Sequence, residues 1–183
     1  MNYSLFIIFL LLNTSILADT LSDRLSNFSQ QKKLHGSFVE TWRSGYLNEP
    51  LISKGELSYQ APGRFRKVIE HPEPVEQIIK GNRIYISRDG ETEIVQLSNQ
   101  KNLAVGIYAL RDVLEGNESS LLERFKSNYS QLNSNWVLEL EPRVKQKAKL
   151  ITLHGQGNYI QRVLILYHNG DSSLTEISND ILK

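Results

Sequence analysis

The stretch from Leu51 to Leu97 constrains the fold most, because its apolar residues fall on every second position between short turn sequences. Pairs such as Leu57 with Tyr59 and Ile84 with Ile86 recur along it. A period of two is typical of strands with one covered face and one wet face. Pro-Gly, Gly-Asn and Asp-Gly dipeptides separate the runs and supply the fixed or positive φ of tight reversals. The stretch therefore predicts about four or five strands of an antiparallel meander, long enough to curl into a half-barrel.

The segments on either side of this meander complete the predicted order of elements. Leu21 to Lys33 has the spacing of a short amphipathic helix, and Leu34 to Tyr46 alternates as a first strand. Ser119 to Lys126 predicts another helix, and the period of two returns from Tyr129 to Ile177. Between Leu97 and Ser119, helical spacings of four, three and four separate the apolar residues Leu103, Ile107, Leu110 and Leu114. These elements favour a mainly β fold with a few helices: a single curled antiparallel sheet, an unclosed half-barrel of about 11 strands, with about three helices over its concave face.

The first 18 residues differ in composition from the rest of the chain. An uncharged apolar run from Leu5 to Leu12 precedes Ala18, a small residue suited to cleavage. The run is too short to span a bilayer, so residues 1–18 predict a secretory signal peptide cleaved near Ala18, and residues 19–183 predict the exported domain. The basic start of a typical signal is missing, which leaves an uncleaved anchor as the alternative.

The composition limits the classes of function. The chain has 183 residues and a formal net charge of +1, which provides no general attraction for nucleic acid. Apolar residues make up 40% and charged residues 22%, as in an ordinary globular protein. The lack of cysteine excludes disulfides, thiol catalysis, Cys-ligated metals and a lipid anchor on an N-terminal cysteine.

No motif in the chain predicts catalysis, a metal site or a bound cofactor. Gly155-Gln156-Gly157 lacks the third glycine of a dinucleotide-binding loop and lies between two predicted strands, so a hairpin turn is the better interpretation. The four histidines have no metal-ligand spacing, and no Gly-x-Ser-x-Gly sequence is present. We therefore expect that the protein is not an enzyme.

A basic segment lies between Glu141 and Leu150. Its alternating cations are Arg143, Lys145, Lys147 and Lys149. In a strand end and hairpin, all four would point to one side. One interpretation is a solvated hairpin whose charges discourage edge pairing. The other is a docking patch for an acidic partner or for anionic headgroups.

The apolar residues of the alternating face either fill a core or line a cavity, because both need the same side chains. A sheet of about ten strands encloses more volume than three short helices fill, which favours a cavity. The candidates for lining it are Phe38, Leu57, Tyr59, Phe65, Ile84, Ile86, Trp136, Leu138, Leu140 and Leu164.

Three short sequences carry a resemblance to a known family. They are Gly55-Glu56-Leu57, Pro62-Gly63-Arg64-Phe65-Arg66 and Gly81-Asn82-Arg83-Ile84-Tyr85, which follow a Phe-containing first strand. In this order they resemble LolA, the periplasmic carrier family for outer-membrane lipoproteins, and the resemblance extends over nearly the whole chain after residue 19. It implies a half-barrel whose concave apolar groove takes acyl chains, with the predicted helix from Leu103 to Leu114 as part of a lid. It also implies an inner-membrane donor complex and an outer-membrane acceptor, with the carrier acting as a monomer.

The chain departs from the LolA pattern at one position. In that family, an arginine just before the proline of the Pro-x-x-Phe sequence hydrogen-bonds the lid, whereas here Ala61 precedes Pro62. The nearest guanidinium groups along the sequence, those of Arg64 and Arg66, lie beyond the turn. The family's gating mechanism is therefore not expected to carry over unchanged.

The hypothesis from the sequence is a periplasmic carrier, or chaperone, that binds acyl chains of a lipoprotein or other lipidated cargo and transports it towards the outer membrane. One alternative is a regulatory domain of the same fold that senses lipid or lipoprotein. The other is a carrier for a lipid product that is not a lipoprotein.

Overall fold

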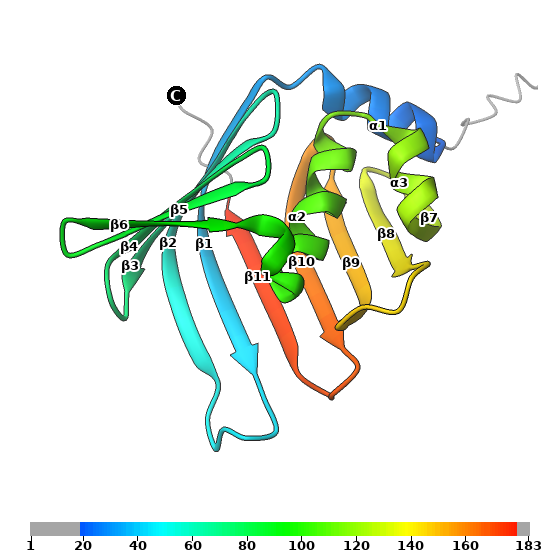
Figure 1. Cartoon of the computed structure of the whole chain (residues 1–183). Coiled ribbons are helices and arrows are strands. Elements are labelled where there is room, and N and C mark those ends of the chain that lie inside the picture. The colour runs from blue at the N-terminus through cyan, green and yellow to red at the C-terminus, as the bar shows by residue number, and fades with distance from the viewer. Residues whose placement is uncertain (1–18, 179–183) are drawn as a thin grey trace, which may run out of the picture.

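The computed structural model describes residues 19–178, which form one sheet of eleven antiparallel strands, three α-helices and a 3₁₀ helix (Figure 1). The predicted signal peptide at residues 1–18 lies outside the described residues. The helices are α1 (Leu21–Ser29), η1 (Leu97–Asn99), α2 (Lys101–Leu114) and α3 (Glu118–Arg124). The strands are β1 (Lys33–Arg43), β2 (Leu51–Gln60), β3 (Arg64–His71), β4 (Val75–Lys80), β5 (Arg83–Arg88), β6 (Glu91–Gln96), β7 (Phe125–Leu132), β8 (Asn135–Pro142), β9 (Ala148–Gln156), β10 (Tyr159–Tyr167) and β11 (Ser172–Ser178).

Two meanders make up the sheet, and the first and last strands of the chain join them. The spatial order is β6-β5-β4-β3-β2-β1-β11-β10-β9-β8-β7. β1 pairs with β11 in a register that places Phe38 opposite Ile177. Within the described residues the edge strands β6 and β7 do not pair with each other, so the sheet curls without closing (Figure 1). The predicted mainly β fold, an unclosed half-barrel of about 11 strands with three helices, is confirmed.

Helix α1 begins at a capping box. The Thr20 hydroxyl accepts from the backbone N–H of Asp23 at 3.2 Å, and the Asp23 carboxylate accepts from the backbone N–H of Thr20 at 3.1 Å. Two free donors of the first turn are thereby satisfied. Its buried Phe28 meets the Trp136 ring edge-on at 5.6 Å between centroids. The helix ends at Ser29, before the predicted Lys33, because pairing of Lys33 with β2 starts the first strand there.

Helix α2 packs on both halves of the curled sheet. Its buried Val105, Ala109 and Val113 belong to the main core, which covers β7 to β10 and also takes in α1 and α3. Its Ala104 and Ile107 belong to a smaller core over β4, β5 and η1. The main core also takes in Tyr59 of β2, and Phe65 of β3 packs against both cores, so β1 to β3 join two packed regions that one helix bridges.

The third helix and the following strand meet at a different residue from the one predicted. The sequence pattern placed Phe125 and Lys126 in the helix, whereas α3 ends at Arg124 and Phe125 begins β7. The Phe125 side chain is buried in the main core. A buried apolar residue fits both the end of a helix and the start of a strand, so the sequence pattern does not distinguish the two.

Candidate functional site

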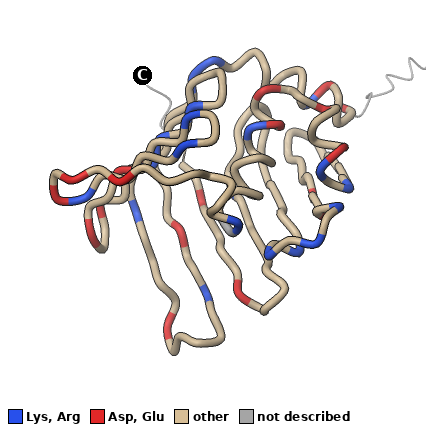
Figure 2. Tube along the Cα trace, viewed as in Figure 1, with Lys and Arg blue, Asp and Glu red and all other residues tan. Residues whose placement is uncertain are grey.

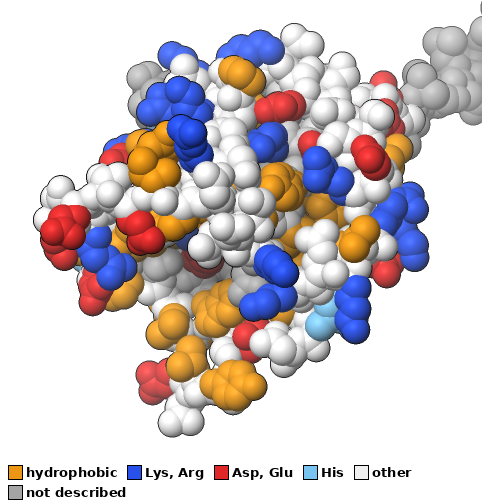
Figure 3. Space-filling view, in the orientation of Figure 1, with side chains coloured by type: hydrophobic (Ala, Val, Ile, Leu, Met, Phe, Trp, Pro, Cys, Tyr) orange, Lys and Arg blue, Asp and Glu red, His pale blue; other side chains and the backbone are white. Residues whose placement is uncertain are grey.

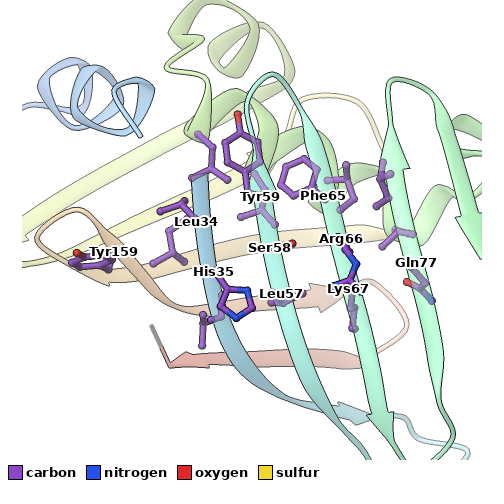
Figure 4. A pocket seen from close by; sticks show the side chains of 18 of the residues that line it. Leu34, His35, Leu57, Ser58, Tyr59, Phe65, Arg66, Lys67, Gln77 and Tyr159 are labelled. Carbon is purple, nitrogen blue, oxygen red and sulfur yellow. The ribbon is translucent and has the colours of Figure 1, made fainter. Parts of the chain in front are cut away.

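A cavity of about 150 Å³ lies between α2 and the concave face of β1 to β3 (Figure 4). Strand residues with apolar side chains form one wall, and apolar residues of α2 form the other. The lining residues are Leu34, His35, Gly36, Leu57, Ser58, Tyr59, Phe65, Arg66, Lys67, Gln77, Ile79, Leu103, Ile107, Leu110, Leu114, Asn158, Tyr159, Ile160 and Ile177. The cavity is therefore an apolar space roofed by a helix.

Register explains which strand residues meet in this wall. Leu34 of β1 pairs with Tyr59 of β2, Tyr59 pairs with Phe65 of β3, and Phe65 pairs with Ile79 of β4. Directly paired residues point to the same face of an antiparallel sheet, so these four side chains form a row across it. The rings of Tyr59 and Phe65 lie 5.1 Å apart, side by side in Figure 4.

Polar groups limit the cavity along β3 and β4. Lys67 lines it and forms an ion pair with Glu40 of β1, while its ammonium group lies 4.7 Å from the centre of the Phe38 ring. Glu40 also accepts a hydrogen bond of 2.9 Å from the Ser173 hydroxyl. Two side chains thus hold the Glu40 carboxylate, and the Lys67 ammonium stays beside the apolar wall.

A second and wider cleft of about 720 Å³ lies farther along the same curled sheet, and Gln77 lines both spaces. Its apolar part is formed by Ile69, Val75 and Ile86. The charged residues around it are Arg88, Asp89, Glu91 and Glu93. The concave side therefore has an apolar compartment under α2 and a mixed compartment near the β5–β6 turn.

The structure brings only part of the predicted groove together. Leu57, Tyr59 and Phe65 line the cavity, as do all four predicted lid residues, Leu103, Ile107, Leu110 and Leu114. Among the lining residues that the prediction missed, four are aliphatic: Leu34, Ile79, Ile160 and Ile177. Leu34 and Ile79 are next in register to Tyr59 and Phe65, so cross-strand pairing would have identified them.

The other predicted groove residues lie elsewhere. Trp136, Leu138 and Leu140 are at most 2% exposed in the main core, because α1 and α2 cover their strand. Ile84 is buried in the smaller core, and Ile86 lines the wider cleft. Phe38 is buried beneath the Lys67 ammonium.

Leu164 points away from the concave face. Its neighbour Ile165 faces α2, since the Ile165 Cδ1 lies 3.0 Å from the position of a Cβ on Gly106. Successive residues of a strand point to opposite faces, which turns Leu164 outward. The run from Val163 to Leu166 is apolar throughout, so its sequence carries no period from which the inner face could be recognised.

The basic segment is the loop of the β8–β9 hairpin together with the start of β9. β8 ends at Pro142 and β9 begins at Ala148, which leaves Arg143, Lys145 and Lys147 in the connection. Strand alternation therefore does not set their direction. The Arg143 guanidinium donates to the carbonyl oxygen of Leu122 at 2.7 Å.

The turn that carries Ala61 lies against the C-terminal part of α2. A Cβ on Gly63 would lie 2.9 Å from a carboxylate oxygen of Glu115 and 3.1 Å from Nε of Arg111. The guanidinium beside this turn is therefore that of Arg111 on the helix. Arg64 and Arg66, the nearest guanidinium groups in the sequence, are not the ones placed there by the fold.

Two buried groups near the cavity have shifted pKa values. Burial raises the pKa of the Tyr59 phenol above its usual value. Burial also raises the pKa of Asp112 on α2, although hydrogen bonding to Ser120 and the nearby Arg124 guanidinium act in the opposite direction. Asp112 and Arg124 are 3.4 Å apart, so this pair links α2 to α3.

The described residues contain no cluster of three or more His, Cys, Asp or Glu side chains that could hold a metal ion. None of the helices between residues 19 and 178 has the length and apolar content that a membrane crossing requires.

Comparisons with known proteins identify the family. The family model described as "Outer membrane lipoprotein carrier protein LolA" matches residues 29–180, a span that contains all eleven strands. Among proteins of curated function, none matches this chain.

Solved structures of similar fold come from several bacteria. A LolA superfamily protein from Nitrosomonas europaea shares 9% identity, covers 87% of this chain and 92% of its own, and gives a TM-score of 0.49. A putative outer membrane lipoprotein-sorting protein domain from Vibrio parahaemolyticus shares 9% identity, with coverages of 88% and 90% and a TM-score of 0.49. A chain of the Pseudomonas aeruginosa MucA/MucB complex shares 17% identity, with coverages of 87% and 56% and a TM-score of 0.47. Because the family model matches the sequence across the entire described sheet, this chain belongs to the LolA family.

Proposed function

We propose that this protein carries the acyl chains of a lipoprotein, or of another lipidated cargo, in the cavity under α2 and transports it through the periplasm towards the outer membrane. The observation that supports the proposal is the apolar cavity between α2 and β1 to β3, in a member of the LolA family. Removing each CH₂ group from water contributes about 0.8 kcal/mol. Affinity for an acyl chain therefore needs an apolar space and no reacting group, so the proposed role is not enzymatic.

The size of the cavity indicates what loading requires. An apolar cavity of about 150 Å³ holds a molecule of about the size of benzene. This cavity has that volume, and a long acyl chain is several times larger. Loading therefore requires α2 to move away from β1 to β3, or the chain to extend past Gln77 into the wider cleft. In either case, Lys67 and Gln77 can donate hydrogen bonds to the ester and head groups of the cargo.

The same cavity would serve a domain that senses lipoprotein, or a carrier for another lipid. Identification of the bound molecule separates these alternatives. The exported protein is purified, extracted with organic solvent and analysed by lipid mass spectrometry. Acyl-bearing protein fragments support a lipoprotein carrier, and free lipids of one class support a carrier for that lipid.

A transfer assay separates a carrier from a sensor. Labelled lipoprotein is offered in inner-membrane vesicles, and its appearance in outer-membrane vesicles is followed with and without the protein. A carrier accelerates transfer, whereas a sensor binds the label without releasing it to the second membrane.

A matched pair of variants tests the cavity itself. Leu110→Glu places a carboxylate in the cavity wall, and Leu122→Glu places one on the exposed side of α3. Burying a charge without a partner is costly, so Leu110→Glu should prevent binding of an apolar fluorescent probe, whereas Leu122→Glu should not. Absence of both probe binding and extracted lipid from the wild-type protein would contradict the proposed function.

A further inference from the structure

Three connections of the chain meet at one end of the sheet. Arg43, the last residue of β1, pairs with Ser172, the first residue of β11, which places the β1–β2 hairpin tip beside the β10–β11 turn. The backbone N–H of His168 in that turn donates to the carbonyl oxygen of Lys147 at 3.0 Å, which places the β8–β9 loop next in line. Figure 1 shows the hairpin and the turn at the bottom and the loop at the lower right. We call this region the lower end of the sheet.

The β1–β2 hairpin tip exposes an unusual amount of apolar surface. Tyr46 is 91% exposed, Leu51 is 60% exposed and Ile52 is 50% exposed, with Leu47 beside them. β2 pairs with β3 only from Lys54 onward, so the tip has no neighbouring strand on that side. Figure 3 shows hydrophobic side chains gathered on this projection. Exposed apolar groups concentrated in this way mark an interaction site.

The directions of these side chains favour a lipid bilayer over a groove on another protein as the partner of the hairpin tip. Leu51 and Ile52 are consecutive strand residues, so they point to opposite faces of the hairpin. A partner that packs on one face of the hairpin would cover only one of them. The interface of a lipid bilayer covers both, and a tyrosine ring is well suited to the headgroup level.

The β8–β9 loop, beside the β10–β11 turn, carries positive charge that complements an anionic surface. Arg143, Lys145 and Lys147 are exposed there, as is Lys149 at the start of β9, and no salt bridge between described residues involves these four. Val144 among them is 70% exposed. Basic groups beside exposed apolar side chains are the combination that binds anionic lipid surfaces.

The acidic groups near this end do not cancel that charge. Glu49 lies at the hairpin tip, and Glu141 beside the loop forms an ion pair of 3.9 Å with Lys126. The Asp171 carboxylate accepts hydrogen bonds from Asn169 and from the backbone N–H of Gly45. The β3–β4 and β5–β6 turns, with Glu73, Asp89 and Glu91, are separated from the basic loop by the β1–β2 tip, because the strand order runs from β6 through β2 and β1 to β11, β10, β9 and β8. Figure 2 shows these acids at the left and the basic loop at the right.

We propose that the lower end of the sheet docks on an anionic phospholipid bilayer, with the β1–β2 tip in the interface and the β8–β9 loop on the headgroups. This inference goes beyond the proposed carrier function and does not depend on the cavity. Leu51 lies on the concave face with Leu57, since the two are six positions apart along β2 and alternate residues share a face. Docking therefore places the cavity wall about 20 Å along the strand from the membrane.

Vesicle binding of tip variants tests the proposal. The exported protein, with its N-terminus sequenced and its lipid removed, is mixed with phosphatidylethanolamine vesicles that contain about one-third phosphatidylglycerol. Tyr46→Ser combined with Leu51→Ser should weaken binding by about tenfold or more, since two apolar side chains leave the interface. Leu132→Ser is the control, because Leu132 is 76% exposed at the opposite end of the sheet.

Charge variants test the second half of the proposal. Lys145→Gln with Lys147→Gln should weaken binding by about fivefold for each lysine, on the anionic vesicles and at low salt. Lys33→Gln with Lys80→Gln, at the opposite strand ends, is the matched control. The weaker binding of the Lys145 and Lys147 variant should not be seen on phosphatidylcholine vesicles, which carry no net charge. If residues 1–18 remain on the purified protein and bind vesicles, they contribute equally to the binding of every variant.

The outcomes are distinct from those that test the carrier function. Wild-type protein that does not bind anionic vesicles, or tip variants that bind as well as the control, would overturn the docking proposal. A dimer that dissociates in the tip variant by analytical ultracentrifugation would assign the tip to a second copy instead. Binding of an apolar probe should be unchanged in the tip variants, and its absence from all proteins would contradict the carrier function alone.

Discussion

Arg111 Nη2 donates a hydrogen bond of 2.9 Å to the carbonyl oxygen of Gly81 and so joins helix α2 to the turn between β4 and β5. The same guanidinium lies beside Gly63 in the turn between β2 and β3. One residue of the helix that roofs the cavity therefore touches two turns at one end of the sheet. The guanidinium beside the turn that contains Ala61 is therefore supplied by helix α2.

Removal of this hydrogen bond should loosen the roof of the cavity. Arg111→Gln shortens the side chain and removes its charge. Because the hydrogen bond is exposed, we expect a loss of about 1 kcal/mol. An apolar probe should then dissociate about fivefold faster in stopped-flow fluorescence. Arg64→Gln, at the exposed start of β3, is the control, and equal dissociation rates in the two variants would show that Arg111 does not hold the helix.

Two leucines of the same concave face should respond differently to truncation. Leu138→Ala removes a side chain that is fully buried in the main core, which costs about 2–5 kcal/mol. Leu57→Ala enlarges a cavity that already exists, so its cost should be about 2 kcal/mol or less, with a clear change in probe affinity. Denaturant unfolding provides both values. If Leu57→Ala costs as much as Leu138→Ala, the space beside Leu57 is packed.

A methyl group on Gly155 should destabilise the fold. Its Cβ would lie 2.0 Å from the Trp136 ring and 2.3 Å from the carbonyl oxygen of Tyr159. Trp136 also donates to the Gly157 carbonyl oxygen at 2.9 Å, so the ring is not free to move. Gly155→Ala should cost about 3 kcal/mol in thermal or denaturant unfolding. Gly45→Ala, where nothing lies within 4 Å, should leave stability nearly unchanged.

Stability should fall at alkaline pH because of Tyr167. Burial, with smaller contributions from Glu40 and Asp171, raises the pKa of Tyr167 from 10.0 to about 12. As pH rises through this window, the unfolded state loses a proton that the native state keeps, so the free energy of unfolding decreases, by about 2 kcal/mol in all. Tyr167→Phe should flatten this decrease in denaturant titrations between those pH values. Tyr46→Phe, at the exposed hairpin tip, is the control substitution. A decrease of equal size in Tyr167→Phe would assign the effect to other groups.

Local patterns in the sequence determined the elements and their inner faces. Helical spacing placed Leu103, Ile107, Leu110 and Leu114 on one face, and all four line the cavity, because helical geometry sets that face without help from distant residues. Alternation between turn dipeptides likewise predicted the meander of a half-barrel. Only at Leu164, inside an apolar run without a period, did the predicted face differ from the one observed.

Tertiary structure alone decided which part of the inner face stays uncovered. Leu57 and Leu138 have the same alternation in sequence, yet helices distant along the chain cover Leu138 and leave a cavity beside Leu57. The contact from Arg111 to Gly81 ends on a backbone carbonyl, which every residue possesses and no sequence pattern marks. A strand's period records the side on which a residue lies, whereas coverage depends on how separate segments pack in space.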